Sequence, residues 1–206
     1  MINSKSDLEI CLSIDSNNYK RVIYDIRKGF FSLFSTFRAR YFTTPISDQI
    51  IIWQFIKTLR RVEYYANNPS LLHSLCLLFY LRKYVRLGRI TGFQIPINCI
   101  GKGLTIWHYG TIIINQDTKI GDYCTLRPDI VIGHKDSSGK SPIIGNNVTI
   151  NSGARIIGDI VIGDDVIVAP NAVITHDVPS HSIVGGIPAR ILKKRSSLNE
   201  EWQPYN

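Results

Sequence analysis

Residues 144–178 read IGNNVTINSGARIIGDIVIGDDVIVAPNAVITHDV, and every sixth residue of this stretch is isoleucine or valine. The residue that follows is often glycine or asparagine, both of which tolerate the unusual backbone angles of corners. Six residues fit one short strand and one corner, so three repeats make a triangular coil of about 18 residues. This period predicts a parallel β-helix. A sandwich of short strands would instead place turns at a spacing of 8–12 residues.

The same register extends upstream to Ile100 and defines which side chains point inward. The first positions are branched apolar residues: Ile114, Ile120, Leu126, Ile132, Ile144, Ile150, Ile156, Ile162, Val168 and Ile174. The fifth positions are small or β-branched residues with one cysteine: Thr118, Cys124, Ile130, Val148, Ala154, Ile160, Val166, Ala172 and Val178. We expect both sets to stack in rows inside the coils.

The repeat is interrupted in two places. Ile106 and Ile114 are eight residues apart, so two extra residues lie around His108. The polar stretch 135–142 (KDSSGKSP) preserves the count of six but has no apolar residue at the inward positions. We expect this stretch to be a loop pushed out of the coil. A histidine on a break of the repeat indicates where the chemistry takes place.

The first 92 residues have a different pattern. Apolar residues recur at helical spacing over residues 23–41 and 46–66, and a third helix from Ser70 to about Leu87 follows Asn67-Asn68-Pro69. Residues 1–20 are interpreted as a polar lead-in. The sequence therefore predicts an α+β chain with a helical N-terminal cap (1–92), a β-helix (93–195) and a flexible tail (196–206).

Charge is divided unevenly between these parts. Residues 1–92 carry 14 basic and 6 acidic residues, a net charge of +8, whereas residues 93–206 carry 10 of each. Nucleic-acid binding is not expected, because no binding motif accompanies the basic residues. Attraction to an acidic polymer or to the anionic face of the inner membrane is one alternative. A solvated helix surface is the other.

The sequence also argues against several classes of protein. The apolar runs are shorter than the ~18 residues that a membrane span needs, and the N-terminus has no secretory pattern. The four cysteines are scattered without CxxC spacing, which indicates free thiols in a reducing compartment and no metal site. The expected location is the cytoplasm, with peripheral contact at the inner membrane as a variant.

Three features together resemble the hexapeptide-repeat acyltransferases. They are the hexads, the string GLTIWHYGT (residues 103–111) and the closing GIPAR (residues 186–190). The similarity is greatest to the serine O-acetyltransferase branch, which includes bacterial enzymes that O-acetylate surface polysaccharides. The resemblance implies a left-handed β-helix, a homotrimer or a dimer of trimers, and active sites between subunits. It also implies direct acetyl transfer from acetyl-CoA.

The resemblance assigns His108 as the catalytic base. The chemistry agrees independently, because a hydroxyl is a poor nucleophile and needs a base that titrates near neutral pH. The residues expected around the acceptor are Trp107, Tyr109, Arg127 and His134. Candidates for orienting His108 are Asn115, Asp117 and Asp129, by nearness in the sequence alone.

The resemblance also assigns residues to acetyl-CoA. Small residues whose backbone would line the pantetheine arm are Ser152, Gly153, Ala154, Ala169 and Pro170. Residues of the closing segment near the nucleotide are Gly186, Pro188, Arg190, Lys193 and Lys194. No phosphate-binding GxxxxGK[ST] loop is present.

The chain departs from the serine-using members at several positions. Trp107 and Phe93 stand where those members have acids, and Lys140-Ser141 stands at their Arg-His pair. A zwitterionic serine needs a carboxylate for its ammonium group, whereas an indole suits the apolar face of a sugar. These departures favour an O-acetyltransferase acting on a bacterial polysaccharide or its repeat unit. The alternatives are a serine acetyltransferase of cysteine biosynthesis, an N-acyltransferase of amino sugars and a non-catalytic trimeric scaffold.

Overall fold

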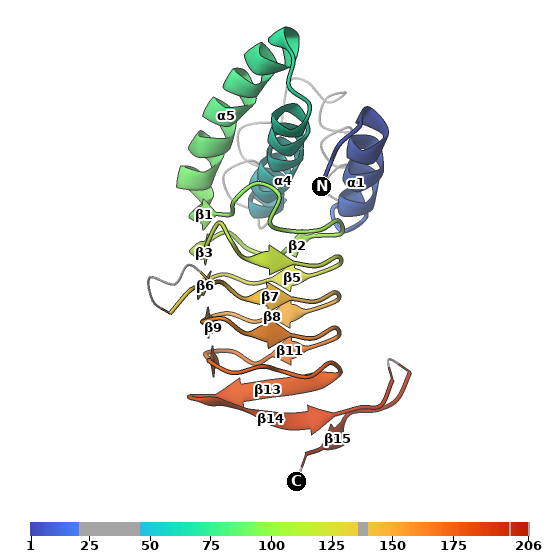
Figure 1. Cartoon of the computed structure of the whole chain (residues 1–206), viewed down its shortest axis with the longest axis vertical. Coiled ribbons are helices and arrows are strands. Elements are labelled where there is room, and N and C mark those ends of the chain that lie inside the picture. Colours follow the sequence, from blue (N-terminus) through green and yellow to red (C-terminus); the bar gives the residue numbers. More distant parts are fainter. Residues whose placement is uncertain (21–45, 136–139, 198, 206) are drawn as a thin grey trace, which may run out of the picture. The chain divides into compact units, whose positions relative to one another are not determined.

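A computed structural model describes residues 1–20, 46–135, 140–197 and 199–205. The chain forms two compact units, residues 1–91 and residues 92–206, which are drawn in Figure 1. The first unit is helical and the second is a β-helix. The helix predicted over 23–41 lies outside the described residues.

Three helices are described in the first unit: α1 (Lys5–Asn17), α4 (Ile46–Asn67) and α5 (Leu71–Thr91). Helices α4 and α5 match the predicted segments, although α5 continues through Gly88 and ends at Thr91. Gly92 then takes a left-handed backbone angle (φ +80°), which ends the helix. The lead-in prediction for residues 1–20 is wrong, because this segment forms α1, whose N-terminus is capped by the Ser4 hydroxyl.

The second unit winds through three parallel sheets in turn. Sheet A contains β1 (Phe93–Gln94), β3 (Ile112–Ile114), β6 (Ile130–Gly133), β9 (Arg155–Ile157) and β12 (Val173–Ile174). Sheet B contains β4 (Lys119–Ile120), β7 (Ile143–Ile144) and β10 (Val161–Ile162). Sheet C contains β2 (Thr105–Ile106), β5 (Thr125–Leu126), β8 (Thr149–Ile150), β11 (Ile167–Val168), β13 (Ser182–Gly186), β14 (Ala189–Lys194) and β15 (Gln203–Pro204).

The hexads fill the interior as predicted. All ten first positions and all nine fifth positions given above are buried, each with at most 6% of its surface exposed. Strand β14 then turns back antiparallel to β13, and β15 pairs with β14. The segment 196–206, for which a flexible tail was predicted, therefore contributes a strand to sheet C. The predicted fold class, a helical cap followed by a hexapeptide β-helix, is confirmed.

Candidate active site

The turns between the sheets define three corners of the β-helix. The His108 corner joins sheet C to sheet A and contains residues 107–111, 127–129, 151–154 and 169–172. The loop corner joins sheet A to sheet B and contains residues 115–118, 134–142, 158–160 and 175–177. The ladder corner joins sheet B to sheet C and contains residues 101–104, 121–124, 145–148, 163–166 and 179–181.

Strand register confirms the expansion at His108. Ile106 pairs with Leu126, and Ile112 pairs with Ile130. The chain therefore advances six residues from sheet C to sheet A in the first coil, but only four in the second. The two extra residues belong to the His108 corner. Gly110 (φ +143°) allows this turn to pass close to the next coil, because a Cβ there would lie 2.8 Å from Pro128 Cβ. The turn exposes His108 and its neighbours Trp107 and Tyr109 to solvent.

Several predicted site residues share this corner with His108. Arg127 is exposed one coil further along, followed by Ser152 with Gly153 and then by Ala169 with Pro170. Backbone hydrogen bonds connect the later coils, from Gly153 N to Pro128 O (3.4 Å) and from Asn171 N to Ser152 O (2.9 Å). Gly153 (φ +80°) packs closely against the next coil, because a Cβ there would collide with the Asn171 side chain. The corner therefore carries a base at one end and small residues along its length.

The turn of the β13–β14 hairpin reaches the same corner. Gly185 lies against Ala169, since a Cβ at Gly185 would be 3.0 Å from the Ala169 Cβ. Gly186 and Pro188 belong to this turn, and Arg190 pairs with Gly185 at its base. Lys193 and Lys194 lie about 10–13 Å further along β14. The Lys194 ammonium is 4.5 Å from the Tyr205 ring, away from the turn.

Other candidates belong elsewhere. Ala154 is fully buried, and its backbone N–H and C=O bond to Asn151 and Val131, so its inclusion among the ligand contacts is wrong. His134 lies at the loop corner, where its Nδ1 accepts from Asn115 Nδ2 (3.0 Å). Within one chain the fold does not bring His134 to His108. Phe93 is 3% exposed and packs inward.

The three residues suggested as partners of His108 are engaged in other contacts. Asn115 and Asp117 lie at the loop corner, and Asn115 also accepts from the Ser141 hydroxyl (3.0 Å). Asp129 is on the His108 corner but forms an ion pair with Arg155 (3.1 Å). For Asn115 and Asp117, nearness in the sequence did not predict nearness in space, because consecutive corners of a β-helix lie on different edges of the prism.

The stretch 135–142 belongs to the loop corner. Ile114 pairs with Ile132 in sheet A, and Ile120 pairs with Ile144 in sheet B. The chain advances six residues from Ile114 to Ile120, but twelve from Ile132 to Ile144. The six inserted residues agree with the predicted extruded loop, of which residues 136–139 are outside the described part. Lys140 at its end forms an exposed ion pair with Asp159 (2.8 Å).

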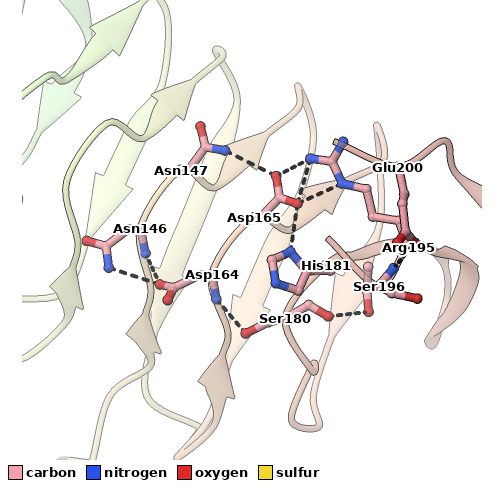
Figure 2. A network of polar contacts seen from close by, with 10 residues as sticks. Asn146, Asn147, Asp164, Asp165, Ser180, His181, Arg195, Ser196 and Glu200 are labelled. Carbon is pink, nitrogen blue, oxygen red and sulfur yellow. Dashed lines mark hydrogen bonds and ion pairs between the residues drawn. The ribbon is translucent and has the colours of Figure 1, made fainter. Parts of the chain in front are cut away.

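A second polar cluster, at the ladder corner, was not anticipated from the sequence. Figure 2 shows Asp165 accepting from Asn147 Nδ2 (3.1 Å), His181 Nδ1 (2.9 Å) and Arg195 Nε (2.9 Å). Asn147, Asp165 and His181 all have left-handed φ angles between +54° and +57°. Burial would raise the pKa of the Asp165 carboxyl, but hydrogen bonds from Arg195 and His181 outweigh it and lower the pKa. This cluster holds the segment after β14 and is separate from the His108 corner.

A three-sheet parallel β-helix with buried hexad positions is the architecture of hexapeptide-repeat proteins. The family model "Bacterial transferase hexapeptide (six repeats)" matches residues 141–176. A serine acetyltransferase of Helicobacter pylori (strain J99) is 36% identical over 127 residues, which are 60% of this chain and 74% of that protein. The chain belongs to the serine acetyltransferase family of hexapeptide-repeat transferases, which confirms the resemblance inferred from the sequence.

Two further relatives extend this comparison. The serine acetyltransferase of Synechococcus elongatus is 35% identical over 106 residues, and the chain spans less than half (43%) of its length. A serine acetyltransferase solved in complex with CoA has a TM-score of 0.62 at 20% identity, covering 91% of this chain and 70% of that one. All three of these relatives are named serine acetyltransferases, and none of the three is named for a polysaccharide substrate.

No helix among the described residues is long and apolar enough to cross a membrane. The described residues also contain no cluster of His, Cys, Asp and Glu with the arrangement of a metal site.

Proposed function

We propose that the chain is an acetyl-CoA-dependent O-acetyltransferase with His108 as its catalytic base. The observation that carries this proposal is the two-residue expansion of the first coil. It exposes His108 on the same corner as the small residues of the later coils. Acetyl transfer between two substrates requires a base beside the acceptor and a surface that holds the acetyl donor next to it. His108 and the small residues along the same corner would meet these two requirements.

The reaction needs one proton acceptor and one leaving group. His108 removes the proton from the acceptor hydroxyl as its oxygen attacks the thioester carbonyl of acetyl-CoA. The C–O bond forms, the C–S bond breaks, and the proton held by His108 passes to the departing CoA sulfur. Histidine suits both steps because its ordinary pKa lies near neutral pH.

The residues proposed for acetyl-CoA are Ser152, Gly153, Ala169 and Pro170, together with the hairpin turn at Gly186 and Pro188. Small side chains allow a narrow chain to approach the backbone. Arg190, exposed at the base of the turn, would meet a phosphate. Lys193 and Lys194 could contribute only to the distal part of the nucleotide. A serine acetyltransferase of the same fold was solved in complex with CoA, which supports acetyl-CoA as the co-substrate.

L-serine is the first acceptor to test, because the relatives quoted above are serine acetyltransferases. A saccharide hydroxyl is the second, supported by the surroundings of His108. Trp107 and Tyr109 on either side of it are 45% and 50% exposed, and aromatic faces stack on sugar rings. Asp129 is the one acid that a single subunit supplies on this corner, and its carboxylate is paired with Arg155 (3.1 Å) instead of facing the ammonium group of a serine. Homotrimer formation, with the site between subunits, is part of the proposal.

One assay distinguishes the acceptors. Release of CoA from acetyl-CoA would be followed with serine, with amino sugars and with a panel of oligosaccharides. Turnover on serine at a rate typical of an enzyme, above about 1 per second, would establish serine and reject the saccharide. Turnover on an oligosaccharide alone would do the opposite. Inertness towards every acceptor, with no acetyl-CoA binding by calorimetry, would leave only the scaffold alternative.

Replacing the base tests the mechanism directly. His108→Ala should lower kcat by a factor of about 10²–10⁴, the usual contribution of a general base. Acetyl-CoA should still bind with its original Kd, because the small-residue row is unchanged. The matched control is His176→Asn, an exposed histidine at the loop corner, which should retain full activity. Full activity of His108→Ala would refute the assignment.

A further inference from the structure

Helix α5 carries its apolar side outward. Its exposed residues fall in adjacent pairs, at 71–72, 74–75, 78–79, 81–82, 85–86 and 89–90, which is one continuous helical face. Eight of these twelve residues are apolar: Leu71, Leu72, Leu75, Leu78, Phe79, Leu81, Val85 and Ile90. Leu71, Leu75 and Phe79 are 85%, 64% and 64% exposed. A surface helix normally turns its apolar stripe to the core.

The opposite face of α5 already provides its packing. The Tyr80 ring stacks on Tyr65 of α4, with centroids 5.5 Å apart, and Tyr84 packs against Phe55 at 5.5 Å. Leu87 is buried on the same side. The helix is therefore held in place without its outward apolar residues, and another cause must account for them.

The charges on this face indicate what covers it. Arg82, Arg86 and Arg89 are exposed among the apolar residues, and α5 contains no aspartate or glutamate. Within the part of the chain that the structure describes, none of these arginines forms an ion pair. A second copy of the same face would bring like charges together without an acid to neutralise them. An anionic surface complements both the leucines and the arginines.

The dimensions of the helix decide how it meets such a surface. Twenty-one residues extend about 31 Å. No described helix can span a membrane, so α5 would lie in the plane of the surface. We propose that the outward face of α5 docks on an anionic lipid bilayer. The leucines and Phe79 enter the boundary between headgroups and acyl chains, and the arginines contact lipid phosphates.

Vesicle flotation of the full chain tests this proposal. Vesicles of phosphatidylcholine containing about one third phosphatidylglycerol should carry the protein, and binding should weaken as salt is raised. Vesicles of phosphatidylcholine alone should bind about tenfold more weakly or less, because each nearby arginine adds to the attraction. Absence of binding to the anionic vesicles would overturn the proposal.

Paired variants locate the contact. Leu75→Ser with Phe79→Ser should abolish flotation, and Arg82→Ser with Arg86→Ser should reduce it on anionic vesicles only. The matched control is Ile10→Ser, an apolar residue of α1 that is 52% exposed, which should float like the original chain. Far-UV circular dichroism checks that each variant is folded. Equal loss of binding by Ile10→Ser would refute the location.

Light scattering without vesicles separates the membrane from a second copy. Leu75→Ser with Phe79→Ser should leave the number of subunits unchanged. A smaller assembly would mean that this face is buried between copies, which would overturn the proposal. Flotation does not depend on acetyl transfer, so this inference and the proposed function can fail independently of each other.

Discussion

At the scale of single residues, the stacked interior has one polar defect. Thr118 is the only fifth hexad position with a hydroxyl group, and it is completely buried. Its Oγ1 has no hydrogen-bond partner among the described residues. A buried hydroxyl without a partner costs about 1–3 kcal/mol, whereas valine has almost the same shape. Thr118→Val should therefore raise the free energy of unfolding by about 1 kcal/mol in urea denaturation.

A control for Thr118→Val lies on the outer face of the same solenoid. Thr149 is half-exposed in β8, so its hydroxyl reaches water. Thr149→Val should change the free energy of unfolding by less than about 0.5 kcal/mol. An equal gain from both substitutions would mean that β propensity, and not the buried hydroxyl, is responsible.

Hexad position predicted which residues point inward, because burial follows directly from the period. It could not assign hydrogen bonds between outward side chains of successive coils. Asn147 and Asp165 are 18 residues apart, one coil, and both residue types tolerate left-handed angles. That spacing was a usable signal for the ladder corner. Ala154 was assigned to the ligand because its side chain is small. Its fifth hexad position already indicated that it points into the coil.

At the scale of elements, α1 shows why a helix can be missed when helices are predicted from the spacing of apolar residues. Its buried residues are Cys11 and Asp15, which do not form an apolar stripe. Asp15 accepts from Arg60 of α4 at 2.9 Å, and Arg60 also bonds Glu63 at 3.1 Å. Charged residues are rarely buried, so their burial could not be predicted from the residue types alone. By contrast, α4 and α5 were predicted from their apolar spacing.

This buried ion cluster makes a strong prediction for the helical unit. Arg60→Met should lower the free energy of unfolding by about 3–5 kcal/mol, because two carboxylates would stay buried without their guanidinium. Urea denaturation followed at 222 nm, which reports the helices, would measure this. Lys140→Met breaks an ion pair whose side chains are 68% and 59% exposed, and should cost no more than about 1 kcal/mol. A similar small loss for Arg60→Met would contradict the role of the cluster.

At the scale of the whole molecule, the solenoid needs its last coil covered. An open sheet edge is a template for pairing with other chains. Here the hairpin of β13 and β14 and the returning strand β15 extend sheet C beyond the last coil. The Arg195 guanidinium lies 4.3 Å from the Trp202 ring while it bonds Asp165. The hexads could not predict this closure, because it begins where the repeat ends and depends on side chains 30 residues apart.

The stability of this closure should depend on pH through Asp165. Because the pKa of its carboxyl is lowered in the folded chain, its stabilising effect is complete above the ordinary carboxyl pKa of about 4 and is lost as pH falls through the lower folded value. Asp165→Asn should therefore reduce the free energy of unfolding at pH 7 by about 1.5–3 kcal/mol, the usual value for hydrogen bonds to a charged group. The difference from the original chain should shrink steadily below about pH 4. Thermal unfolding between pH 3 and pH 7 measures it, with Asp159→Asn, half of an exposed ion pair, as the control. A difference that is constant across this range would show that Asp165 acts through shape alone and that its charge does not hold the terminal strand.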